Sequence, residues 1–174
     1  MSNITKPTLS KRGNSKYHQG KFKPHNPFKV IGNPNNIIYR SKWELCFLKW
    51  LDCTPSVLRY ASEEVIILYR SPLDGKVHKY FMDFYMEVLQ PYGTTKKFLI
   101  EIKPFAQTMM PKAPKNGVLT ESYQNEIKTY VKNQAKWEAA RSVCLQKGWE
   151  FRILTEKELF RKGSPNNGKP KRHK

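Results

Sequence analysis

Two apolar runs of this chain carry charged side chains near their ends, and this pattern limits the folds that the chain can adopt. Asp83 lies in YFMDFYMEV (80–88), and Glu101 and Lys103 close FLIEIK (98–103). Aromatic and β-branched residues dominate both runs, which predicts strands. Because residues two apart in a strand share a face, Glu101 and Lys103 should point the same way. Two carboxylates and a lysine on neighbouring strands can bind Mg²⁺ and stabilise a phosphate anion, which is the chemistry of a nuclease.

The remaining patterns predict an α/β chain. Ser41 is a candidate helix N-cap, which places the first helix over 41–52. Strands are predicted at 64–70, 77–88, 97–103 and 149–154, a long helix at 121–147 before Gly148, a loop at 104–120, and a last short helix after Thr155. The order α–β–β–β–α–β–α favours one domain over 37–162, with a central mixed sheet flanked by helices.

The net charge of +18 is concentrated at the two ends of the chain. Residues 1–29 carry seven lysines and arginines and residues 161–174 carry six, with no acidic residue in either segment. Residues 1–36 and 163–174 lack hydrophobic periodicity, which predicts two basic, largely disordered arms. Such arms favour nucleic acid as a partner over the alternatives, a solubilising role or an anionic membrane surface.

The apolar segments and the cysteines argue against a membrane-spanning protein and against a secreted protein. No run approaches the roughly 18 apolar residues of a membrane span, and the first residues lack the apolar stretch of a signal peptide. Cys46, Cys53 and Cys144 are odd in number and have no metal-ligand spacing, which indicates reduced thiols in a cytosolic protein. No membrane partner is expected, and the residues specify no oligomeric state.

Glu44 is the third candidate carboxylate of a metal site. Lys42 and Lys49 mark the exposed stripe of the first helix, and Glu44 lies on its apolar side. Because Glu44 follows Ser41 by three residues, it fits a capping box, which would turn its side chain back to the helix start. Alternatively, a carboxylate directed at a core needs a partner there, and a metal ion is such a partner.

Each of the three strand residues also has a purely structural interpretation. Asp83 has apolar neighbours on both faces and could accept a hydrogen bond from a buried donor. Glu101 and Lys103 could form a plain salt bridge. Their position at a strand end, where Pro104 opens a loop, favours a functional role. There Lys103 could help to deprotonate the attacking water or could stabilise the phosphorane charge.

Other candidates carry less weight. Gln134 and Lys136 lie beside aromatic residues of the long helix and could face DNA, although packing of that helix on the sheet explains most of its apolar positions. Glu63 and Glu64 are charges at the start of a strand or supports of the site. The candidate DNA contacts are Arg40, Lys42, Gln134 and Lys136.

These residues resemble a known family. Glu44 on the first helix, Asp83 on the second strand and Glu101-Ile102-Lys103 on the third resemble the PD-(D/E)xK nucleases, whose restriction-endonuclease-like core has the same αβββαβ order. Met82 stands where that motif often has proline. The chain more closely resembles the head-completion nucleases of tailed phages and, more distantly, TnsA-type transposase endonucleases. The stretches that carry this resemblance are NPNNIIYRSKWELCFLKWLD (33–52), ASEEVIILYRSPLDGKVHKYFMDFYME (61–87), FLIEIKP (98–104) and NQAKWEAARSVCLQKGWEFRILTEKEL (133–159).

The resemblance implies Mg²⁺-dependent cleavage of DNA, with Mn²⁺ as a substitute, in head completion and virion maturation after DNA packaging. It implies that Glu44, Asp83, Glu101 and the backbone carbonyl of Ile102 hold the metal and that Lys103 is catalytic. Capsid or portal proteins would be partners, in the virion and in the host cytoplasm. Two other functions stay open: a structural head-completion protein that binds DNA ends or the portal without cleaving, and a TnsA-like endonuclease subunit that works only beside a transposase partner.

Overall fold

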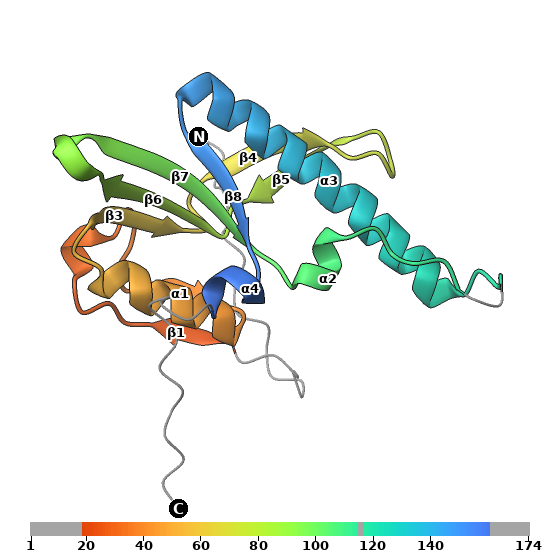
Figure 1. The fold of residues 1–174 in the computed structure, drawn as a ribbon, viewed down its shortest axis with the longest axis horizontal. Coiled ribbons are helices and arrows are strands. Elements are labelled where there is room, and N and C mark those ends of the chain that lie inside the picture. Colours follow the sequence, from red (N-terminus) through yellow and green to blue (C-terminus); the bar gives the residue numbers. More distant parts are fainter. Residues whose placement is uncertain (1–18, 115–116, 161–174) are drawn as a thin grey trace, which may run out of the picture.

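The computed structural model describes residues 19–114 and 117–160, and a four-stranded sheet forms its centre (Figure 1). The strands are β3 (Val57–Ser62), β6 (Phe84–Leu89), β7 (Thr95–Ile102) and β8 (Glu150–Leu154), in the order β3-β6-β7-β8. The first three are antiparallel neighbours, and β8 runs parallel to β7. The predicted mixed sheet flanked by helices, a restriction-endonuclease-like α/β fold, is confirmed.

The sheet separates two hydrophobic cores. Helix α1 (Lys42–Cys53) packs on one side and the long helix α3 (Glu121–Lys147) on the other (Figure 1). Because successive residues of β7 point to opposite faces, Phe98 and Ile100 join the core under α1, whereas Leu99 joins the core under α3. The same alternation places Glu101 on the α3 side.

The strand predictions need two corrections. The first core strand is β3, which the sequence pattern did not predict, because a register irregularity between Val57 and Arg59 interrupts its alternation. The predicted strand at 64–70 corresponds to β4 (Ile66–Arg70), which pairs with β5 (Val77–Phe81) in a separate two-stranded hairpin packed on α3.

The second correction concerns the predicted strand 77–88. It is two strands, β5 and β6, that belong to different sheets and are separated by Met82 and Asp83. The apolar run continues through the break because Met82 is fully buried there. Hydrophobicity therefore gives no sign that the chain passes from one sheet to another.

The segment 19–36 belongs to the fold, which corrects the prediction of a disordered arm over 1–36. Strand β1 (Gly20–Phe22) pairs with β2 (Ile37–Tyr39), and a 3₁₀ turn, η1 (Pro27–Lys29), lies between them. The buried carboxylate of Asp52 holds this segment by accepting hydrogen bonds from the N–H groups of His25 and Asn26 and from the Tyr60 hydroxyl. Three-residue strands and contacts across 26 or 27 positions leave no local pattern in the sequence. Residues 1–18 and the predicted tail 163–174 lie outside the described residues.

The other predictions of secondary structure are confirmed, with small additions. Helix α3 begins after the N-cap Thr120 and ends at Gly148, whose φ of 65° is left-handed. The segment 104–120 contains one short helix, α2 (Phe105–Thr108), and the β6–β7 connection contains a 3₁₀ turn, η2 (Pro91–Gly93). Thr155 caps α4 (Glu156–Leu159) with a complete capping box. No helix within the described ranges is long and apolar enough to cross a membrane, and the three cysteines are free.

Candidate active site

The fold brings Asp83, Glu101 and Lys103 together. Residue Phe84 of β6 pairs with Ile100 of β7, so the same antiparallel register sets Asp83 beside Glu101. Oδ2 of Asp83 accepts the backbone N–H of Ile102 at 2.8 Å, and Nζ of Lys103 lies 2.9 Å from Oε1 of Glu101. The predicted salt bridge therefore exists, but it forms beside a second carboxylate and not on an exposed strand.

The electrostatics of this cluster depend on an excess of negative charge in a confined space. Burial and the neighbouring carboxylate of Glu101 raise the pKa of Asp83 well above its ordinary value, and Lys103 and the Ile102 N–H oppose the rise only in part. Burial lowers the pKa of Lys103, but the charges of Asp83 and Glu101 outweigh burial and raise it. Lys103 is therefore a cation here, and Asp83 lacks a full counter-charge.

Glu44 makes the hydrogen bonds of a helix cap. Its backbone N–H donates to Oγ of Ser41 at 3.1 Å, the Ser41 hydroxyl donates to Oε1 of Glu44, and Oε2 accepts the backbone N–H of Arg40 at 2.6 Å. The half-buried carboxylate also lies close enough to Lys103 and Asp83 to affect their pKa values. Burial raises the pKa of Glu44, and the Arg40 and Ser41 donors oppose that rise. Both interpretations of Glu44, a cap and a neighbour of the site, fit this position.

A fourth acidic residue, Glu63, borders the cluster. It follows β3 with a φ of 55°, which is uncommon for a residue other than glycine, and its N–H donates to the backbone carbonyl of Asp83 at 3.3 Å. Its carboxylate binds the Arg40 guanidinium through two hydrogen bonds of 2.9 and 3.2 Å. Arg40, a predicted DNA contact, is thus held beside the carboxylates, and the role of Glu63 as a support of the site stays a prediction.

The donor set fits a hard cation bound through few protein ligands. Among the described residues, no three histidine, cysteine, aspartate or glutamate side chains are grouped closely enough to hold a metal by themselves. Mg²⁺ commonly uses one or two carboxylates and completes its octahedron with water and substrate phosphate. The pair Asp83 and Glu101 meets that requirement, and its uncompensated negative charge favours a divalent cation. The roles of Glu44 and of the Ile102 carbonyl as ligands stay predictions.

Helix α3 contributes one cation to this region. The Lys136 ammonium lies over the ring of Tyr80, 5.0 Å from its centroid, and 5.8 Å from that of Tyr69. Burial lowers the pKa of Lys136, while Glu101 acts to raise it. Gln134 is half-buried, and Lys42 is exposed at the start of α1. Contact of these side chains with DNA stays a prediction.

Tyr80 is the site residue that the sequence analysis did not identify. Its hydroxyl donates to Oε2 of Glu101 at 2.7 Å from a position that is 3% exposed. Strict alternation through one continuous strand would place Tyr80 and Asp83 on opposite faces. The break at Met82 and Asp83 cancels that alternation, so only the change of sheet could have revealed Tyr80.

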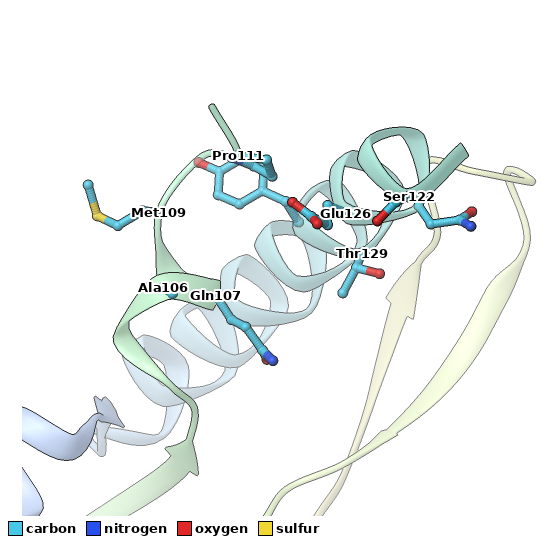
Figure 2. Close-up of a pocket in the computed structure, with 9 residues that line it drawn as sticks. Ala106, Gln107, Met109, Pro111, Ser122, Glu126 and Thr129 are labelled. Carbon is cyan, nitrogen blue, oxygen red and sulfur yellow. The ribbon is translucent and has the colours of Figure 1, made fainter. Parts of the chain in front are cut away.

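A separate pocket lies between α2 and the first half of α3 (Figure 2). Its walls include Ala106 and Gln107 of α2, Met109 and Pro111 of the segment after α2, and Ser122, Asn125, Glu126, Thr129 and Tyr130 of α3. None of the clustered carboxylates lines it, and Glu126 is the one charged wall residue among those that the structure describes. The carboxylate cluster is therefore the candidate active site. Cleavage of a phosphodiester needs anionic and cationic groups close together, and this pocket does not supply them.

Comparisons with known proteins show which family the chain resembles. Residues 54–156 match the family model described as TnsA-like endonuclease N terminal. Asp83, Glu101 and Lys103 fall inside that match, and Glu44 falls before it. The chain is also similar to the head completion nuclease of Enterobacteria phage T4, with 39% identity over 144 residues, which is 82% of this chain and 93% of the relative.

Proposed function

The chain belongs to the TnsA-like endonuclease N-terminal family, and from that premise we propose that it is a Mg²⁺-dependent DNA endonuclease that acts in phage head completion. The observation that carries this proposal is the cluster on β7 and the β5–β6 junction, where the Lys103 cation pairs with Glu101 beside the under-compensated Asp83. The similarity to a phage head completion nuclease supports the biological setting.

Each residue then has a defined task. Asp83 and Glu101 would hold the cation, with Glu44 as a third carboxylate and the Ile102 carbonyl as a further ligand. Bound Mg²⁺ supplies positive charge at the scissile phosphate and helps to activate the attacking water. Lys103, kept protonated by its carboxylate neighbours, stabilises the negative charge that develops on the phosphorane. The DNA backbone is bound by the basic terminal segments and by four further side chains, those of Arg40, Lys42, Gln134 and Lys136. These contacts give affinity without sequence preference.

The setting of the proposed activity is the phage head, in the virion and in the infected cell. Capsid or portal proteins are the proposed partners. A TnsA-like subunit that cuts only beside a transposase is the second candidate function, and the specific observation in its favour is the family match over 54–156.

We expect the full-length protein to nick supercoiled plasmid in Mg²⁺ or Mn²⁺ and to leave it intact in EDTA. Because the net charge is +18, nicking and DNA binding should weaken steeply between about 50 and 200 mM salt. The measurement is a gel assay of plasmid relaxation across metal and salt concentrations, paired with a DNA-binding assay in EDTA.

Three results of that assay separate the candidates. DNA binding without nicking in any metal, with or without a partner, would favour the structural head-completion protein and contradict the enzyme. Nicking that appears only after a transposase partner is added would favour the TnsA-like subunit. Nicking by the protein alone supports the proposal.

The variant Glu44→Gln tests whether Glu44 is a metal ligand or only a helix cap. Glutamine keeps an acceptor oxygen for the Arg40 N–H but removes the charge, so we expect unfolding free energy within about 1 kcal/mol of the wild type. If Glu44 helps to hold the cation, the nicking rate should fall about tenfold or more. Thermal melting in EDTA and plasmid nicking measure the two effects.

The matched control is Ser41→Ala, which removes the other half of the cap and no carboxylate. It should cost about 1 kcal/mol of stability and leave nicking unchanged well below the melting temperature. Wild-type nicking by Glu44→Gln would leave Glu44 as a cap alone.

A further inference from the structure

The Glu101 carboxylate is held from two sides. Its Oε1 pairs with Nζ of Lys103 at 2.9 Å, and its Oε2 accepts the Tyr80 hydroxyl at 2.7 Å. Lys103 directly follows β7, the strand of Glu101, whereas Tyr80 comes from β5 of the separate hairpin. The hairpin therefore reaches the cluster through one buried hydrogen bond.

The Tyr80 ring is fixed by neighbours from two elements. Tyr69 of β4 meets it edge to face, with 6.4 Å between centroids and 79° between planes. The Lys136 ammonium of α3 covers it at 5.0 Å. Held in this place, the Tyr80 hydroxyl donates its proton to Oε2 of Glu101 at 2.7 Å.

We propose that Tyr80 is a positioning residue of the site, which fixes the rotation of the Glu101 carboxylate for its proposed role as a ligand of the divalent cation. This inference rests on the proposed function. Hydrogen bonds to the carboxylates that ligate metals commonly orient them, and their loss typically weakens metal binding 10–100-fold. The β4–β5 hairpin is on this account part of the active site and more than a cover for α3.

Tyr80→Phe tests the proposal because it removes the hydroxyl and keeps the ring. We expect the full-length variant to bind Mn²⁺ about tenfold or more weakly, and the Mg²⁺ concentration that gives half-maximal nicking to rise by a similar factor. At saturating Mg²⁺ the nicking rate should stay within about threefold of the wild type, because Tyr80 does not touch the substrate. Calorimetry with Mn²⁺ and a Mg²⁺ titration of plasmid nicking measure these effects.

Tyr69→Phe is the matched control. It removes a hydroxyl from the adjacent buried ring of the same hairpin. Within the described ranges this hydroxyl makes no hydrogen bond to Glu101, so Tyr69→Phe should leave Mn²⁺ binding and the Mg²⁺ requirement unchanged. A second comparison places Tyr80→Phe in a Glu101→Gln background. Because Tyr80 acts through the Glu101 carboxylate, Tyr80→Phe should cause almost no further loss of Mn²⁺ affinity in the Glu101→Gln background.

The outcomes distinguish this inference from the proposed function. If the wild type binds Mn²⁺ and nicks DNA while Tyr80→Phe matches it in both Mn²⁺ affinity and Mg²⁺ requirement, the inference is overturned and the proposed function stands. If the wild type shows neither Mn²⁺ binding nor nicking, both are overturned. Equal losses from Tyr80→Phe and Tyr69→Phe would also overturn the inference, because they would indicate general loosening of the hairpin.

Discussion

Lys103→Met is expected to reduce plasmid nicking by about three orders of magnitude, the scale on which one well-placed charge stabilises a transition state. The side chain is 27% exposed and pairs with a nearly buried Glu101, so methionine can fill its place without disturbing the strand. DNA affinity should change by about twofold at most, since one of many basic groups is lost. Nicking in Mg²⁺ and DNA binding in EDTA measure the two quantities.

Lys103→Arg distinguishes the two roles that are open to this lysine. Arginine stays protonated in proteins and cannot accept a proton from water. Because carboxylate neighbours raise the pKa of Lys103, we expect a cation that stabilises charge, and arginine should restore part of the activity that methionine loses. Activity as low as that of Lys103→Met would instead indicate a proton acceptor or a site that does not tolerate the longer side chain.

Lys97→Met is the control for the strand. Lys97 lies on β7, six residues before Lys103, and its ammonium is 3.9 Å from Glu87, away from the cluster. The nicking rate of Lys97→Met should stay within about twofold of the wild type, because the loss of a lysine from a surface ion pair has little effect. Wild-type nicking by Lys103→Met, with Lys97→Met equally active, would contradict the assignment of the active site.

The sequence was sufficient to predict the three clustered residues because β7 is regular. Alternation along β7 and into Lys103, the residue directly after it, placed Glu101 and Lys103 on one face, and antiparallel pairing with β6 brought Asp83 beside them. Helix α3 and its αL terminus at Gly148 were equally accessible, since a 27-residue helix offers many turns of periodic pattern.

What the sequence could not reveal depends on contacts between distant segments. Tyr80 reaches Glu101 only because the chain leaves one sheet and enters another at Met82 and Asp83, and both sides of that break are equally apolar. The segment after β1 is held by Asp52, whose buried carboxylate binds backbone N–H groups 26 and 27 residues earlier in the chain. Neither contact has a periodicity that a local pattern could express.

Asp83→Asn should abolish nicking and at the same time stabilise the metal-free protein. Asparagine keeps an acceptor for the Ile102 N–H but removes a charge that faces Glu101 and Glu44. We expect a gain of about 1 kcal/mol near neutral pH, which corresponds to a rise of about 2–4 °C in melting temperature. Stability given up for a functional charge is common at active sites.

The sign follows from proton binding. The folded protein holds the Asp83 proton more tightly than the unfolded chain does, because burial and Glu101 raise its folded pKa. Wild-type stability therefore falls as pH rises from the ordinary aspartate range to the raised pKa, and the cost persists above it. The advantage of Asp83→Asn should be present near neutral pH and should shrink towards pH 4, where the wild-type carboxyl is protonated.

Metal should reverse the order of the two proteins. A cation that binds only the folded wild type, at a concentration of about ten times its Kd, adds about 1.4 kcal/mol of stability. Asp83→Asn lacks the charge that attracts the cation. The wild type should therefore melt at a lower temperature than Asp83→Asn in EDTA and at a higher temperature in Mg²⁺. Asp74→Asn is the control: Asp74 is exposed in the hairpin turn, and the Lys76 N–H and His78 lower its pKa, so its neutralisation should bring no gain. A melting temperature of Asp83→Asn below that of the wild type in EDTA would show that Asp83 is a structural acceptor whose charge the fold requires.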